Sequence, residues 1–158
     1  MKKLLFTQRR LVHHRRMAKV VGLVVLCLLI FNSFFSEAQN PLVKMWDYRF
    51  GGDSMESFTC FIQTSDGGFI LGGTTDSPIS GDKTDSLRGS PGDDDYWIVK
   101  TDSLGNKQWD KDFGGTSEDN LISILQTTDG GYILAGSSSS GIGGDKTQSN
   151  WGNNDYWI

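Results

Sequence analysis

From residue 45 onward, apolar and β-branched residues come in short runs, and each run ends at glycines or at small polar residues. Runs of this length and composition favour β-strands, and this part of the sequence lacks the 3.6-residue apolar period of an amphipathic helix. An Asp-Gly-Gly sequence at 66–68 supplies a tight hairpin turn. A loop rich in Gly, Ser and Asp covers 76–94. The pattern predicts strands at residues 45–50, 58–64, 69–75, 95–101 and 107–113.

The same pattern of strands and turns returns further along the chain. The sequence W-D-x-x-F-G-G begins at Trp46 and again at Trp109, and 109 − 46 is 63. The sequences Q-T-x-D-G-G and G-D-K-T return at this offset, whereas D-Y-W-I returns from Asp95 to Asp155, and 155 − 95 is 60. The difference lies in the loop before D-Y-W-I, because loops absorb length changes at little cost. A fixed period of this size is typical of repeat arrays and propellers.

Each copy of the pattern predicts four antiparallel strands with aromatic residues at fixed places, as in the blade of a β-propeller. We therefore predict an all-β, β-propeller-like fold of tandem four-stranded blades that form an incomplete ring, with an open β-solenoid as the alternative. The first blade covers residues 39–108, and the second, truncated blade covers 109–158. Because a closed ring needs at least about four blades, further repeats of the same chain are expected downstream.

Residues 1–38 have a different chemistry from the rest. Seven basic side chains and no acid occur in the first 19 positions, and an apolar run follows at 20–31. This order is typical of a signal peptide, and about 12 apolar residues fall short of the roughly 20 that span a bilayer. Small residues at Ser36 and Ala38 predict cleavage after Ala38, with Met17 as an alternative start. We expect a secreted or cell-surface protein without stable membrane insertion after cleavage; the alternative is an uncleaved anchor.

Charge and residue usage beyond residue 38 exclude several functions. This part has 8 Lys and Arg (15 less 7) against 18 Asp and Glu (19 less 1), so it repels nucleic acids and anionic membranes. Both histidines, His13 and His14, precede it, which removes Ser-His and Cys-His mechanisms. Cys60 is its only cysteine, so no intramolecular disulfide forms. The sequence predicts no catalytic residue.

Acidic residues gather in the loop before each D-Y-W-I strand and next to each G-D-K-T turn. Their hard oxygen atoms are the ligands that calcium prefers, although the alternating D-x-D-x-D-G order of a known calcium loop is missing. Loop solvation and turn capping are the competing interpretation. The candidate calcium ligands are Asp82, Asp93, Asp94, Asp95, Asp145 and Asp155.

Tryptophans and glutamates offer further candidates. Four tryptophans recur in register, which favours packing between neighbouring blades: Trp46, Trp97, Trp109 and Trp157. Trp151 stands where the first copy has Arg88, so it is the better candidate for an exposed ligand contact. Paired carboxylates can hydrolyse a glycosidic bond, and Glu56 and Glu118 are the glutamates available for that chemistry.

The combined strings W-D-x-x-F-G-G, Q-T-x-D-G-G, G-D-K-T and D-Y-W-I resemble the repeats of large secreted and cell-surface proteins of Bacteroidetes, which often carry a type IX secretion sorting domain. The resemblance covers nearly all of residues 44–158. It implies propeller-like repeats without an established activity in most members. The leading hypothesis is therefore an exported scaffold that binds an extracellular glycan or protein, or has a structural role. The alternatives are a carbohydrate-active enzyme and a calcium-stabilised structural array.

Overall fold

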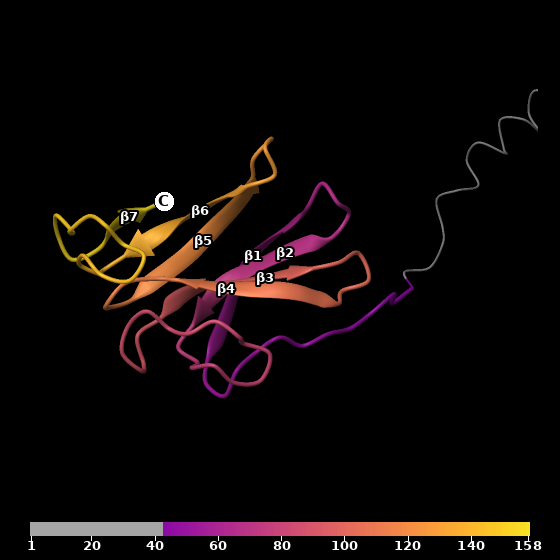
Figure 1. The fold of residues 1–158 in the computed structure, drawn as a ribbon, viewed down its shortest axis with the longest axis horizontal. Helices are drawn as coiled ribbons and strands as arrows, with labels where there is room; N and C mark the ends of the chain where they lie inside the picture. Colours follow the sequence, from indigo (N-terminus) through magenta and orange to yellow (C-terminus); the bar gives the residue numbers. More distant parts are fainter. Residues whose placement is uncertain (1–42) are drawn as a thin grey trace, which may run out of the picture. The chain divides into compact units, whose positions relative to one another are not determined.

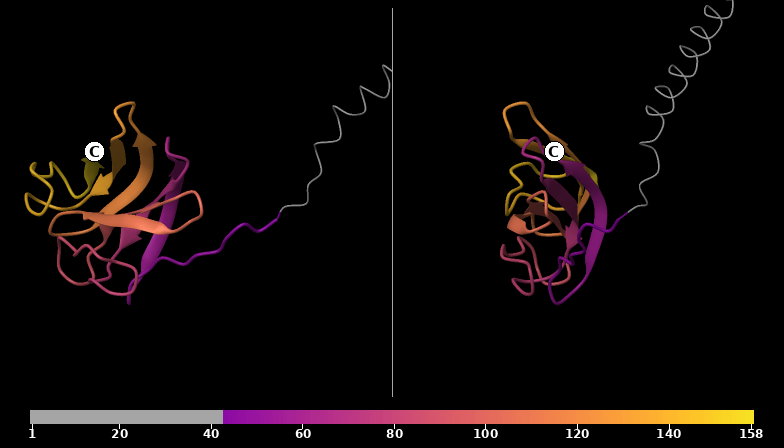
Figure 2. Two further views of the ribbon diagram at one scale, coloured as in Figure 1. Left: turned by 45° about the vertical axis from the view of Figure 1, so that its right-hand side comes forward. Right: turned by 90° about the vertical axis from the view of Figure 1, so that its right-hand side faces the viewer.

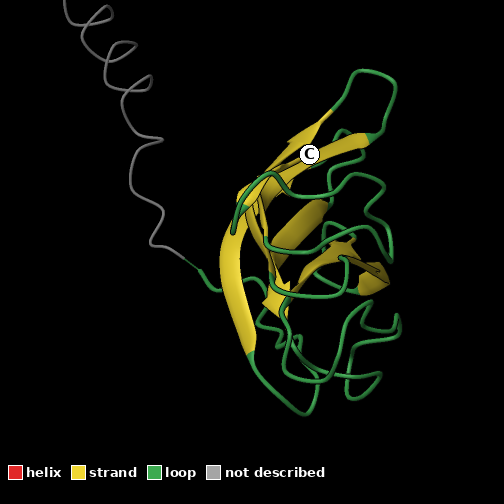
Figure 3. Ribbon diagram, turned by 90° about the vertical axis from the view of Figure 1, so that its left-hand side faces the viewer, coloured by secondary structure: helices red, strands yellow, loops and turns green. Residues whose placement is uncertain are grey.

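The computed structural model describes residues 43–158, so the predicted signal peptide lies outside the described residues. The described part contains strands and loops without a helix, as the all-β prediction requires (Figure 3). Within it, no helix is long and apolar enough to cross a membrane. The strands are β1 (Glu56–Gln63), β2 (Phe69–Thr75), β3 (Asp95–Thr101), β4 (Lys107–Phe113), β5 (Asp119–Gln126), β6 (Tyr132–Ser138) and β7 (Asp155–Trp157).

The strands form two antiparallel sheets, in the orders β1-β2-β3-β4 and β5-β6-β7 (Figure 1). Strands β2, β3 and β4 have the bounds that the sequence predicts. The β1–β2 hairpin turns at Gly67, whose φ of 82° favours glycine. Asp66 accepts hydrogen bonds from Thr64 Oγ1 at 2.5 Å and Gly68 N at 3.0 Å, which fixes this turn. Gly130, with a φ of 88°, has the same place in the second sheet.

The segment at residues 45–50 differs from its prediction as a strand. It forms no sheet pairing, whereas its copy in the sequence, β4, pairs with β3 in the register Tyr96↔Phe113. A strand needs a neighbouring edge for its backbone hydrogen bonds. β4 finds that edge in the preceding D-Y-W-I strand, and within residues 43–158 no such strand precedes position 45. β4 therefore completes the first sheet instead of opening the second, so sheets and sequence copies are one strand out of phase.

The core lies between the two sheets, where β5 packs against β1, β2 and β3, and Figure 2 shows β5 beside β1. Its buried side chains come from both sheets: Ile70, Tyr96 and Ile98 from the first, Leu121 and Ile124 from the second. Gly72 lets the sheets approach, because a Cβ atom there would lie 2.4 Å from Ile124 Cδ1.

We predict that Gly72→Ala destabilises the protein by about 1–3 kcal/mol, because the added methyl group overpacks the space between the sheets. Denaturant unfolding of the full chain measures this change. Gly141→Ala is the matched control, since a Cβ atom at Gly141 meets nothing within 4 Å. Equal stability of the two variants would contradict the tight sheet-to-sheet contact at Gly72.

Candidate functional site

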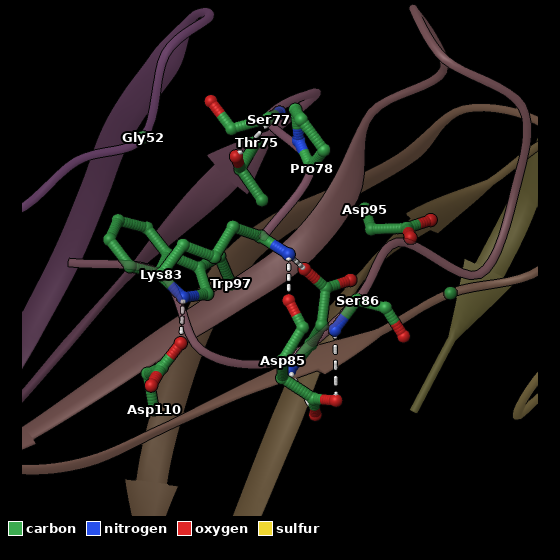
Figure 4. Close-up of polar contacts among 12 residues, drawn as sticks. Gly52, Thr75, Ser77, Pro78, Lys83, Asp85, Ser86, Asp95, Trp97 and Asp110 are labelled. Atoms are coloured by element: carbon green, nitrogen blue, oxygen red, sulfur yellow. Dashed lines mark hydrogen bonds and ion pairs between the residues drawn. The ribbon is translucent and has the colours of Figure 1, made fainter. Parts of the chain in front are cut away.

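A network of buried charged side chains joins the loop at 76–94 to β3 and β4. The side chains of Lys83 and Asp112 are both fully buried and form an ion pair. Lys83 Nζ also donates a hydrogen bond to the backbone oxygen of Asp85 at 2.5 Å (Figure 4). Asp95, at the start of β3, is likewise 0% exposed. The loop with the G-D-K-T sequence is therefore anchored in the interior by its lysine.

Burial controls the protonation of the two aspartates in this network. Desolvation raises the pKa of Asp112 to about 8, and it outweighs the opposing effect of Lys83, while a hydrogen bond with Asp95 favours the protonated form. Desolvation also raises the pKa of Asp95. With one proton on the pair, one ammonium, one carboxylate and one carboxylic acid sum to zero charge. Such neutrality is the condition under which burial of charged groups is tolerated.

A second carboxylate, Asp110 on β4, connects the same loop to the tryptophan of β3. Trp97 Nε1 donates to Asp110 at 3.0 Å (Figure 4). Thr84 donates to the same carboxylate through its backbone N at 2.9 Å and its Oγ1 at 2.5 Å. Lys107 Nζ lies 2.7 Å from Asp110 Oδ1. Burial alone would raise the pKa of Asp110, but these contacts outweigh it and hold the pKa below its usual range. Residues from three sequence motifs thus meet at one carboxylate.

The candidate catalytic glutamate Glu56 is engaged in a turn. Its Oε1 accepts hydrogen bonds from Gly52 N at 3.1 Å and Ser77 Oγ at 2.5 Å. Asp119, 63 positions later, accepts from Gly115 N at 2.7 Å and from Ser140 Oγ at 2.9 Å. The counterpart of Glu56 is therefore Asp119.

Glu118, the other candidate, lies one residue before Asp119 and is exposed. Its backbone oxygen accepts a hydrogen bond from Ser139 N at 2.8 Å, so its contact with the loop is made by the main chain. Glu56 lines a pocket on the outer face of the first sheet, and Glu118 is not among the residues that line it.

Two of the candidate calcium ligands cap the loop before their own strands. Asp95 Oδ2 accepts a hydrogen bond from Arg88 N at 2.6 Å, and Asp155 Oδ2 accepts one from Trp151 N at 2.6 Å. The two contacts are the same, although the intervening loop is three residues shorter in the second copy. The loop in the second copy therefore loses three residues between Trp151 and Asp155, and the hydrogen bond from the backbone to the aspartate is kept.

The remaining candidates are spread over different contacts. Asp145 pairs with Arg88 Nε at 2.8 Å, Asp82 accepts a bond from Lys107 through its backbone oxygen, and Asp93 accepts from Ser90 N at 3.3 Å. Desolvation, followed by neighbouring acids, raises the pKa of Asp94. Among residues 43–158, no group of three or more His, Cys, Asp and Glu side chains is arranged to hold a metal ion.

Trp151 is 99% exposed. It borders a hollow of about 270 Å³ whose lining includes Lys146, Asn150 and Tyr156. An exposed ring beside a polar hollow can stack on a ligand, so Trp151 stays a predicted ligand contact.

Sequence reasoning missed an aromatic pocket of about 280 Å³ on the outer face of the first sheet. Tyr48 and Phe50, from the segment at 45–50, line it together with Phe58 of β1 and Trp97 of β3. The rings of Tyr48 and Phe50 stack with centroids 6.3 Å apart. The pocket depends on this segment lying beside the sheet, and the only sequence signal was the alternation of aromatic residues at 46, 48 and 50.

The described part of the chain is thus an all-β structure of two stacked antiparallel sheets with a buried polar network. No protein-family model matches the chain, and no curated protein matches it.

We predict that Asp112→Asn makes stability less dependent on pH. The folded protein holds one proton on the Asp112–Asp95 pair beside Lys83, and the unfolded chain releases this proton between pH 3.8 and about 8, since burial raises the pKa of Asp112 to about 8. The free energy of unfolding therefore falls as the pH rises through this window, by at most about 1.4 kcal/mol per pH unit, and levels off above it. Denaturant unfolding at pH 5–8 measures the slope, which should be flatter in the variant.

Asp129→Asn is the control, because the pKa of Asp129 is shifted in the opposite direction from that of Asp112. Hydrogen bonds from Thr127 and from Gly131 N lower the pKa of Asp129, so its contribution is lost only as the pH falls below the usual range of a carboxyl group. The pH 5–8 slope should be unchanged in this variant. A slope in Asp112→Asn as steep as in the wild type would refute the shared proton.

Proposed function

We propose that the chain is a β-propeller-type module that serves outside the cell as a binding or structural scaffold. One observation carries this proposal: the same aromatic contact recurs at the same offset. Trp46 lies against Phe69 with ring centroids 5.9 Å apart, and Trp109 lies against Tyr132 at 6.3 Å. Each pair joins a W-D-x-x-F segment to the second strand of the sheet that follows. A contact repeated in this way supports sheets that stack in series, which is how propeller blades pack.

The use of the motif residues also supports a scaffold. Asp110, Glu56 and Asp119 each accept several hydrogen bonds from the turns and loops of the fold. Carboxylates held this way fix loop geometry on a rigid sheet, which suits a surface for display. The proposed location outside the cell depends on the signal-like chemistry of residues 1–38.

Two aromatic surfaces are the proposed ligand contacts. One is the pocket on the first sheet, which is lined by the aromatic residues Tyr48 and Phe58, and these residues are 51% and 65% exposed. The other is Trp151. Aromatic faces stack on sugar rings and on apolar side chains, so the proposed ligand is an extracellular glycan or protein. The carbohydrate-active enzyme is the second candidate, favoured by one observation: Glu56 lines the aromatic pocket.

A calcium-stabilised array is a further proposal, supported by the acids around Asp94: burial raises the pKa of Asp94 most, and the charges of Asp76, Glu118 and Asp93 raise it further. Its test is the melting temperature of the full chain with added calcium and with chelator. A rise with calcium that Asp94→Asn removes would establish this array. A melting curve that is the same in both conditions would eliminate it.

We predict that the full chain binds glycans on an array without releasing reducing sugar from them. Release of reducing sugar that Glu118→Gln abolishes would overturn the scaffold proposal, and because Glu118 is exposed, this variant should fold. Glu56→Gln also weakens a turn, so Asp119→Asn serves as its matched structural control. Loss of activity in Glu56→Gln but not in Asp119→Asn would identify Glu56 as catalytic.

A further inference from the structure

Tyr96 of β3 joins the two sheets, because its side chain packs against the second sheet. Tyr96 is 2% exposed, and its ring lies 4.9 Å from the ring of Trp157 in the second sheet. Its hydroxyl group donates a hydrogen bond to the backbone oxygen of Trp157 at 3.2 Å. A Cβ atom at Gly136 would lie 2.6 Å from that hydroxyl oxygen, so the glycine leaves room for the tyrosine.

The hollow that receives Tyr96 has a counterpart on the first sheet. Phe113, Leu134 and Trp157 line a hollow together with Tyr96, and Gly136 lies beside the hydroxyl group of Tyr96. Subtracting the copy offsets of 63, or 60 for the tryptophan, gives Phe50, Leu71, Gly73 and Trp97. These four residues all line the pocket of about 280 Å³ on the outer face of the first sheet. The pocket is thus built like the seat of Tyr96.

Tyr96 also has a counterpart in the second copy of the pattern, at the opposite end of the described structure. Tyr156 on β7 corresponds to Tyr96, since 156 − 60 is 96. It is 94% exposed, and β7 is the edge strand of its sheet. A large exposed aromatic side chain and a hollow of matching construction, on opposite ends of one molecule, are complementary surfaces.

We propose that two copies of this chain associate head to tail, with Tyr156 of one copy in the Phe50–Leu71–Gly73 pocket of the other. The internal contact between the two sheets is the template for this interface. The inference extends the proposed stacking scaffold, because it names a second copy as the partner of the exposed sheet faces. Such a contact does not close on itself, so it generates a series of oligomers unless the geometry closes a ring.

Charge determines how strong this association is. In the first sheet, β4 pairs with β3 so that Trp97 lies opposite Asp112, the partner of the buried Lys83. In the head-to-tail contact, the segment at 45–50 takes the place of β4 beside β7, and Arg49 stands where Asp112 stands (112 − 63 = 49).

The buried lysine of the second copy of the pattern is Lys146, which is 6% exposed and donates to Ser138 Oγ at 3.0 Å and to the Ser140 backbone oxygen at 2.8 Å. It would face Arg49 of the partner molecule. Like charges in contact weaken an interface, and an opposite charge strengthens it. The native sequence therefore limits its own association through Arg49.

The experiment is sedimentation velocity of the full chain over a range of concentrations, with the variants Arg49→Asp and Arg49→Asp/Tyr156→Ala. Both positions are exposed, so the variants should fold, which circular dichroism checks. We expect Arg49→Asp to associate at least about tenfold more tightly than the wild type, and Tyr156→Ala to remove that gain. Ile142→Ala in the Arg49→Asp background is the matched control, since this loop residue is 69% exposed, and it should leave association unchanged.

Equal association of wild type and Arg49→Asp, including two monomeric proteins, would overturn the inference. Tighter association that survives Tyr156→Ala would also overturn it. The N-terminal apolar segment is the same in every variant, so any association that it causes cancels in the comparison. A negative result here leaves glycan binding by the proposed scaffold intact, because the glycan array measures a sugar bound at the aromatic pocket or at Trp151, and that binding needs no second copy of the chain.

Discussion

The buried ammonium group of Lys83 is the constraint on which the first sheet depends. A lysine in the interior needs an acid beside it, and the acid comes from β4, a strand that begins 24 positions later (107 − 83). The second acid, Asp95, belongs to β3, so three separate segments must assemble before the charge is balanced. The contact therefore makes the long loop, the central strand and the edge strand of this sheet one cooperative unit.

The two sheets contact each other where a glycine of one sheet leaves room for a large side chain of the other. Gly72 receives Ile124 from one side, and Gly136 receives the hydroxyl group of Tyr96 from the other. Interiors are packed too densely for side chains of ordinary size at both positions of such a contact. The glycines in the strands thus have a packing role, which differs from the role of Gly67 and Gly130 in the turns.

Local patterns predicted what depends on local physics. The strands at β2, β3 and β4 and the turn at Gly67 follow from β-branched residues and from glycine, both of which act within a few positions. The segment at 45–50 could not be predicted correctly, because pairing depends on whether a neighbouring edge is present. The sequence predicts only a turn at G-D-K-T and gives no sign that Lys83 is buried, because its burial depends on Asp112, whose position follows only from the pairing of β4 with β3.

The mismatch in phase between sequence copies and sheets has a consequence for how such a chain can lengthen by duplication. Each copied segment supplies the closing strand of the sheet before it, together with the acids that Asp110 and Asp112 represent. An inserted copy would therefore share a sheet, and a buried charge, with each of its neighbours. Each unit added by duplication would therefore be joined to its neighbours by strand pairing and by a buried ion pair. Units joined in this way form one continuous structure and not a series of independent domains.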